Sequence, residues 1–160
     1  MVEVREVGPD DWLIMRDVRL AALRDAPYAF ASTYAREAQL TEDEWRRRAS
    51  GRNSFLAYLP ELGAVPAGIA AGIEDGPGAF ELVSMWVRPQ ARGRTAGSAL
   101  ITAVVDWARA RGACALHLWV TENNKPARRL YERCGFTPTG ERQPLPSDPR
   151  LAEIGMTRPL

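Results

Sequence analysis

The sequence has few of the residues that bind metals or form disulfides. Among 160 residues there are two cysteines and one histidine, and no Cys-x-x-Cys pair occurs. These side chains cannot complete a tetrahedral site of the usual ligand types without carboxylates, so we expect no metal. Cys114 and Cys134 are predicted to be reduced, buried thiols of a cytosolic protein.

A strong net charge and long apolar runs are also absent. The formal net charge is +1, so the chain as a whole has no attraction to nucleic acid, and any affinity for phosphate has to be local. No run of 18 apolar residues occurs, and the N-terminus lacks the basic-then-apolar layout of a signal peptide. We therefore expect a cytoplasmic protein without nucleic-acid or membrane partners.

What remains is an ordinary globular composition, with 46% hydrophobic and 26% charged residues. The length suits one domain with a substantial core. Because no repeat, linker or low-complexity segment is present, we predict a single domain over residues 1–160.

Apolar periodicity and turn signals predict the elements of the first half of the chain. The capping box that begins at Thr41 opens a short helix, and the turn at 74–78 joins two strands in a hairpin. The expected elements are a strand over 2–7, helices to about Asp25 and over 41–49, and strands over 54–59, 65–73 and 80–87.

In the second half, a helix that begins near Thr95 and ends at Gly112 leads to a strand over 114–120. A strand, a helix and a strand at this spacing predict a parallel βαβ unit with a right-handed crossover. A further helix starts after Asn124, and two strands follow around a proline-rich loop, Pro144–Pro149. The chain is therefore predicted to form a mixed α/β domain.

The connection between the 80–87 strand and the next helix is a loop that carries glycines and three arginines, Arg88, Arg92 and Arg94. The first N–H groups of a helix are unpaired and carry a partial positive charge. A strand, such a loop and a helix N-terminus therefore predict an anion site, and the expected anion is a phosphate or pyrophosphate.

Two motifs resemble those of the GNAT superfamily of acetyl-CoA-dependent N-acetyltransferases. The first is Arg92-Gly93-Arg94-x-x-Gly97-Ser98-x-Leu100, and the second is Asn124-x-x-Ala127-x-x-Leu130-Tyr131-x-x-x-Gly135-Phe136. Together they span roughly residues 80–137. The resemblance implies a central, mostly antiparallel mixed sheet with a parallel βαβ unit at the coenzyme site, flanked by about four helices. It also implies acetyl-CoA as cosubstrate.

In that family the glycine-rich loop holds the coenzyme A pyrophosphate, here with Arg92 and Arg94 as charge partners. Thr95 stands where the family usually has glycine, which costs little if residue 95 has helical dihedrals. The strand before the loop would bind the acetyl arm through its backbone. The residues assigned to the coenzyme are Met85, Trp86, Val87, Arg92, Gly93, Arg94, Thr95, Ala96, Gly97, Ser98, Asn124 and Ala127.

The resemblance also suggests catalytic residues. Tyr131 matches the tyrosine that protonates the departing thiolate in many members, although its helical spacing also suits a core aromatic. Glu81 aligns with the base carboxylate of the histone-acetylating branch; the alternative is a glutamate that points to solvent. Other candidates for the base are Glu74, Asp75, His117 and water.

The predicted reaction is direct attack of a primary amine on acetyl-CoA in a ternary complex. Phe30 and Tyr34 are predicted to contact the acceptor, within walls formed by Ser32, Trp45 and the Pro144–Pro149 loop. Aromatic walls with few fixed charges favour a small amine over a basic peptide. The alternatives are a non-catalytic acyl-CoA sensor and a protein or peptide acetyltransferase, and a homodimer is compatible with each of them.

Overall fold

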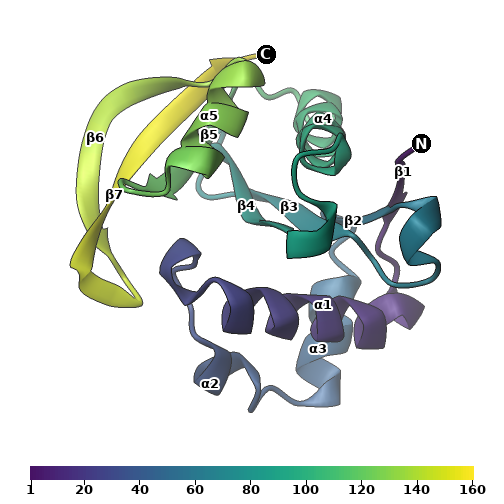
Figure 1. The fold of residues 1–160 in the computed structure, drawn as a ribbon. Coiled ribbons are helices and arrows are strands. Elements are labelled where there is room, and N and C mark those ends of the chain that lie inside the picture. Colours follow the sequence, from purple (N-terminus) through teal and green to yellow (C-terminus); the bar gives the residue numbers. More distant parts are fainter.

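The computed structural model describes residues 1–160 and contains one seven-stranded sheet with helices on both faces (Figure 1). The strands are β1 Glu3–Glu6, β2 Ser54–Tyr58, β3 Gly68–Glu74, β4 Phe80–Val87, β5 Ala115–Thr121, β6 Thr137–Leu145 and β7 Asp148–Pro159. The α-helices are α1 Trp12–Asp25, α2 Tyr34–Glu37, α3 Glu42–Ala49, α4 Ala96–Ala110 and α5 Lys125–Arg133.

The strand order is β1-β2-β3-β4-β5-β7-β6, and β4 and β5 are the only parallel neighbours. Helix α4 connects these two strands, as expected for a βαβ unit. Strands β3 and β4 form the predicted hairpin. The predicted fold class, a mixed and mostly antiparallel sheet with one parallel βαβ unit, is confirmed.

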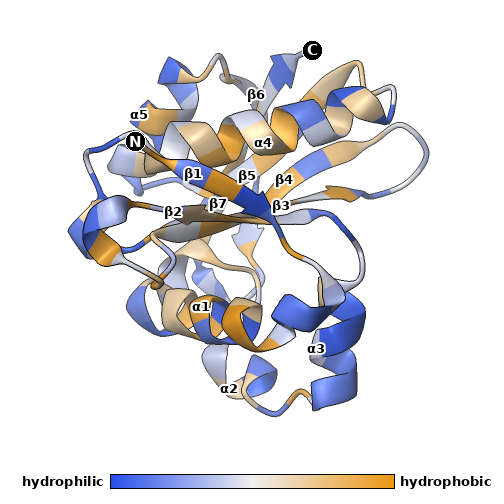
Figure 2. Ribbon diagram, turned by 90° about the vertical axis from the view of Figure 1, so that its right-hand side faces the viewer, coloured by the Kyte–Doolittle hydropathy of each residue, from blue (hydrophilic) through white to orange (hydrophobic).

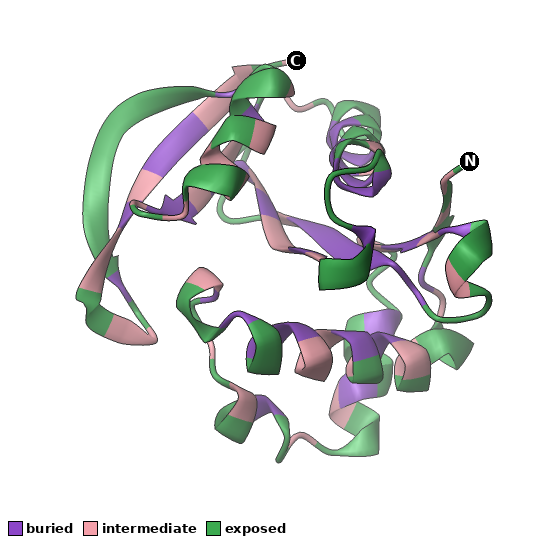
Figure 3. Cartoon of the chain, in the orientation of Figure 1, coloured by how far each residue is buried: buried purple, intermediate pink, exposed green.

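The helices form two layers. Helices α4 and α5 lie over one face of the sheet, and α1 to α3 lie over the other (Figure 1). Leu100, Val104 and Trp107 of α4 belong to the core of the first face, whereas Met15 of α1 and Trp45 of α3 belong to the core of the second. The apolar stripe of α4 and its buried positions both face the sheet (Figures 2 and 3).

Several boundaries differ from prediction. Strand β3 begins at Gly68 rather than at residue 65, because Pro66 has no N–H to donate to a ladder. The proline-rich loop shrinks to residues 146–147, since Pro144 lies in β6 and Pro149 in β7. These positions tolerate proline because β6 is an edge strand, and β5 pairs with β7 only from Glu153 onward.

The prediction of two buried thiols is wrong for Cys114 and holds only in part for Cys134. Both cysteines are free, as expected, but Cys114 is exposed in the connection before β5 and Cys134 is half-buried at the end of α5. Strand β5 starts one residue later than predicted, so Cys114 has no place on its buried face. No helix has the length and apolar composition needed to cross a membrane.

A buried ion-pair network connects the three helices of the second face. The Glu37 carboxylate in α2 accepts hydrogen bonds from Arg19 of α1, at 3.0 and 2.9 Å, and from Arg48 of α3, at 2.9 Å. Its side chain is 2% exposed. Burial favours the neutral acid, but the two guanidinium groups outweigh it and lower the pKa of Glu37 to about 2.

Replacing Glu37 should destabilise the protein in a pH-dependent way. Because the folded-state pKa is below the ordinary 4.5, the carboxylate contributes its full stabilisation above that pH and loses it as the pH falls towards 2. Glu37→Gln should lower the free energy of unfolding by about 3 kcal/mol at pH 7, since two arginines lose a buried partner. Denaturant titrations between pH 2 and 7 measure this difference, which should shrink below pH 4.5.

The matched control is Glu42→Gln, which removes the exposed i,i+4 partner of Arg46. An exposed pair of this kind is worth less than about 1 kcal/mol. An equal loss in the two variants, or a difference for Glu37→Gln that does not change with pH, would contradict the assigned role of Glu37.

Candidate functional site

The parallel strands β4 and β5 pair at one point only. Glu81 lies opposite His117 near the start of both strands, and no pairing follows towards their C-terminal ends. A bulge bends β4 in the same region, because Ser84 and Met85 face the single residue Ala70 of β3. Ser84 has φ 59°, an uncommon value for a non-glycine residue. The carboxyl ends of the strands thus diverge, the usual place for a ligand in a parallel sheet.

The predicted anion loop lies at this opening. No backbone acceptor of the protein bonds the N–H groups of residues 93–98. Gly93 has φ +77°, which favours glycine, whereas Thr95 has φ −91° and ψ 0° and caps α4. The condition under which threonine would cost little, helical dihedrals at residue 95, is therefore met, and threonine fits there without backbone strain. Six unpaired amides at the start of a 15-residue helix can bind an anion.

The two arginines of this loop are paired with carboxylates. Arg92 donates to Asp25 Oδ2 at 2.7 Å and to the Val87 carbonyl at 2.9 Å. Arg94 pairs with Glu61. These side chains are about half exposed, and exposed pairs contribute at most about 1 kcal/mol. Either guanidinium could therefore turn to a bound phosphate at little cost.

Helix α5 begins on the other side of the opening. The Asn124 side chain accepts from the Ala127 N–H at 3.4 Å, which confirms its predicted capping position and occupies that amide. One helical turn further, Tyr131 is 7% exposed, and its ring meets Phe136 edge to face at 5.9 Å. Burial, with a smaller contribution from Cys134, raises the pKa of Tyr131, so its phenol keeps its proton at neutral pH.

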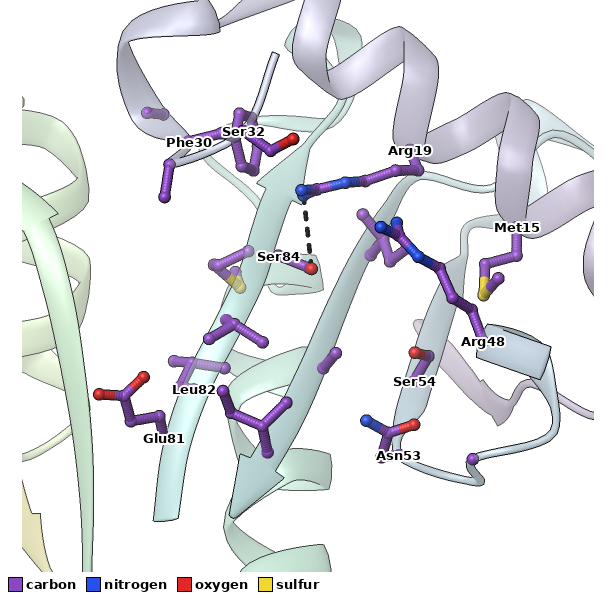
Figure 4. Close-up of a pocket in the computed structure, with 18 of the residues that line it drawn as sticks. Met15, Arg19, Phe30, Ser32, Arg48, Asn53, Ser54, Glu81, Leu82 and Ser84 are labelled. Atoms are coloured by element: carbon purple, nitrogen blue, oxygen red, sulfur yellow. Dashed lines mark hydrogen bonds between the residues drawn. The ribbon is translucent and has the colours of Figure 1, made fainter. Parts of the chain in front are cut away.

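A cleft of about 610 Å³ continues from this opening across the sheet towards α1 and α3. Met85 and Tyr131 line it near the diverging strands, and Phe30, Ser32 and Trp45 line it on the helical side. Figure 4 shows the cleft, with Arg19 and Arg48 reaching in from the helices and Glu81 further along β4. Its size is that of a typical small-molecule site.

One end of the cleft is acidic. Glu81 Oε1 lies 3.5 Å from His117 Nδ1, and His117 Nε2 lies 3.0 Å from Glu141 Oε1. Hydrogen bonds from Thr139 and then from His117 lower the pKa of Glu141. Gly155 makes this arrangement possible, because a Cβ there would lie 2.8 Å from Glu141 and 2.9 Å from His117.

A second carboxylate, Glu153 of β7, lines the same end. It is 6% exposed and accepts a hydrogen bond from Gln143 Nε2 at 2.7 Å. Burial raises the pKa of Glu153; the bond from Gln143 opposes this, and the negative charge of Glu81 adds to it. Two carboxyl groups that interact in one cleft can exchange protons with a ligand.

Not every predicted residue lies where it was expected. Tyr34 does not line the cleft, because its ring lies under the Arg24 guanidinium and its hydroxyl accepts from Arg24. Pro144 and Pro149 line a separate depression. Trp86 turns to the second face and donates to Asp25. The expectation of few fixed charges is also wrong, since charged groups line both ends of the cleft.

Of the alternative bases, Glu74 accepts from the Gly78 N–H in the hairpin turn, and neither it nor Asp75 lines the cleft. His117 is not simply packed, because it contacts two carboxylates as well as the Trp119 ring. No group of three or more histidine, cysteine or acidic residues is placed to hold a metal ion.

Sequence reasoning missed Glu153, Arg19, Arg47 and Arg48. A signal existed for the first two. Glu153 lies between apolar residues, Leu151 and Ala152 before it and Ile154 after it, and Arg19 lies four residues after Met15 on the buried stripe of α1. No pattern indicates Arg48, which follows two other arginines on a polar helix.

Comparison with known proteins agrees with this geometry. Residues 18–136 match the acetyltransferase (GNAT) family. A mycothiol acetyltransferase from Beutenbergia cavernae is 40% identical over an alignment that covers 41% of this chain and 27% of the relative. An uncharacterized N-acetyltransferase from Schizosaccharomyces pombe is 31% identical, with 53% and 52% covered. The chain thus spans about a quarter to a half of these relatives.

Solved structures resemble the whole fold. A GCN5-related N-acetyltransferase from Kribbella flavida has a TM-score of 0.71 at 24% identity, with 99% of this chain and 98% of that chain covered. A candidate acetyltransferase from Salmonella typhimurium, solved with its cofactor acetyl-CoA, has a TM-score of 0.79 at 17% identity, with 100% and 94% covered. The family match covers most of the sequence, and the fold agrees with it over the full length. This chain therefore belongs to the GNAT family of acetyltransferases.

Proposed function

We propose that this protein transfers the acetyl group of acetyl-CoA to the primary amine of a small molecule. The observation that carries the proposal is the position of the cleft. It begins at Met85 and Tyr131, where β4 and β5 diverge, and it ends among ionisable side chains on the far side of the sheet. The loop with the unpaired amides of residues 93–98 is next to this end, because a Cβ on Gly97 would lie 3.6 Å from the Met85 side chain. A donor could enter from one side and an acceptor from the other, so that both meet at Met85 and Tyr131.

The coenzyme would bind along the first half of this path. The amides of residues 93–98 would hold the pyrophosphate at the N-terminus of α4, where the helix dipole favours negative charge. Its acetyl arm would lie against β4, and the bulge at Ser84 leaves backbone groups there outside the regular ladder. One of these N–H groups would stabilise the oxyanion of the tetrahedral intermediate.

In the proposed reaction, the lone pair of the amine attacks the thioester carbonyl carbon. The C–N bond forms, the C–S bond breaks, and the sulfur takes the electron pair. Tyr131 gives its proton to this sulfur, and Glu81 accepts the proton that the amine loses. We propose Glu81 as base because it lies in the cleft on β4, four residues before Met85.

Direct transfer is preferred to an acyl-enzyme intermediate. Neither cysteine lines the cleft. Cys114 is exposed before β5, and burial raises the pKa of Cys134, which keeps that thiol protonated and weakly nucleophilic.

Tyr131→Phe should lower kcat by about 100-fold, because the variant retains the packing against Phe136 and loses only the acidic proton. The affinity for acetyl-CoA should stay the same. Release of coenzyme A with a panel of amines measures kcat, and calorimetry measures binding. An unchanged kcat would remove Tyr131 from the reaction. Binding of acetyl-CoA without turnover on any amine would instead favour a non-catalytic acyl-CoA sensor.

Gly93→Ala should weaken acetyl-CoA binding about tenfold, since an alanine at φ +77° costs roughly 1–2 kcal/mol and moves the loop away from its anion-binding conformation. Gly78→Ala is the matched control. Gly78 has φ +75° and lies in the distant β3–β4 turn, and a Cβ added to it would have no atom within 4 Å. The prediction fails if the two variants bind acetyl-CoA equally well.

Glu81→Gln should lower kcat/KM for amines by about 100-fold at neutral pH, because an amide cannot accept the proton. Glu153→Gln should cost less than tenfold, since Glu153 is buried beside Gln143 and influences the site through Glu81. Steady-state kinetics of the two variants at several pH values tests the assignment. The reverse order of the two losses would give the role of base to Glu153.

A further inference from the structure

The helical end of the cleft contains more positive than negative charge. Arg19, Arg47 and Arg48 all line it, and the only carboxylate that forms an ion pair with any of them is Glu37, which pairs with Arg19 and Arg48. Arg47 forms none of the protein's ion pairs. Three arginines and one carboxylate therefore leave an excess of two positive charges at this end, and Arg47 has no ion-pair partner.

The network with Glu37 does not use all the donors of its arginines. Glu37 takes up Nε and Nη2 of Arg19, while Nη1 turns to the Ser84 hydroxyl across the cleft at a long 3.4 Å (Figure 4). Arg48 gives Glu37 only its Nη1, and its side chain is 46% exposed. Each guanidinium thus keeps donors for a ligand, and Glu37 holds both groups in place beforehand.

The far end of the cleft has the opposite charge. Glu81 and Glu153 line it, and Glu81 precedes Ser84 by three residues on β4. At the usual rise of a strand, Glu81 lies roughly 10 Å along β4 from Ser84, the residue that Arg19 contacts. A cleft with walls of low dielectric constant focuses such fields, so a ligand with charges at both ends would be oriented along it.

We propose that the acceptor is a small molecule that carries a carboxylate remote from its reactive amine, and that Arg47, Arg48 and Arg19 bind this carboxylate. The amine then faces β4 between these arginines and Glu81, next to Met85, where the acetyl group is proposed to lie. This inference rests on the proposed acetyl transfer and adds the chemical class of its acceptor. Guanidinium forks suit a carboxylate because they can donate two parallel hydrogen bonds.

The test uses pairs of primary amines that differ only in a carboxylate or a carboxamide, such as 5-aminopentanoate and 5-aminopentanamide, or β-alanine and β-alaninamide. For the wild-type protein, kcat/KM should be at least tenfold higher for the carboxylate of the preferred pair. Arg47→Gln and Arg48→Gln should each reduce this ratio several-fold, mainly through KM for the carboxylate. In Arg48→Gln, Arg19 still pairs with both oxygens of Glu37, so the fold is retained.

Arg46→Gln is the matched control. Arg46 is the neighbour of Arg47 in α3, it pairs with Glu42, and it does not line the cleft. This variant should keep the wild-type ratio. Two outcomes overturn the inference while the proposed function stands. In the first, the wild-type protein acetylates all amines with a carboxylate-to-carboxamide ratio of kcat/KM near one. In the second, the Arg46, Arg47 and Arg48 variants all change this ratio equally.

A binding measurement separates this inference from the proposed function. Trp45 and Trp119 line the cleft, so tryptophan fluorescence can report binding of the N-acetylated carboxylates and carboxamides. If no amine is acetylated, the binding measurement still tests the carboxylate site. The site is supported if the N-acetylated carboxylate binds tenfold more tightly than the N-acetylated carboxamide and if Arg47→Gln abolishes this difference. Equal binding overturns it. Preferential acetylation of a C-terminally blocked acidic dipeptide over every small amine would overturn the small-molecule assignment.

Discussion

The separation of β4 from β5 after a single paired position is the constraint on which the site depends. Continuous pairing would close the sheet, and the cleft could not reach from Met85 and Tyr131 to the helices on the other face. Two features coincide with the separation. The bulge at Ser84 bends β4, and the contact of Glu81 with His117 marks the last point at which the strands pair.

The charges of the cleft are arranged by the elements that form it. Strands β4 and β7 bring Glu81 and Glu153 to one end, and α1 and α3 bring arginines to the other. Glu37 stabilises the helical end because it is buried and paired, which explains why a two-turn helix such as α3 can hold Arg48 in a fixed place. The same network therefore contributes to stability and presents donors to the cleft.

Much of the fold could be predicted from local patterns. The capping box at Thr41, the turn at residues 74–78 and the glycine stops at 112 and 135 each depend on a few neighbouring residues, and all are present. Threonine was expected to fit at position 95 if that residue has helical dihedrals, a local property, and its dihedrals are helical. Tyr34 was misplaced because its position depends on Arg24, ten residues earlier, and no local pattern indicates that contact.

The sequence by itself determined the order of elements, the anion loop and the family resemblance, because these follow from periodicity, turn chemistry and short motifs. Only the tertiary structure decided which charges share the cleft. Glu81 and Glu153 are 72 positions apart in the chain, and Arg19 lies far from both, yet all line one cavity. Strand register and helix packing bring them together, and such long-range contacts leave no spacing that a sequence pattern can reveal.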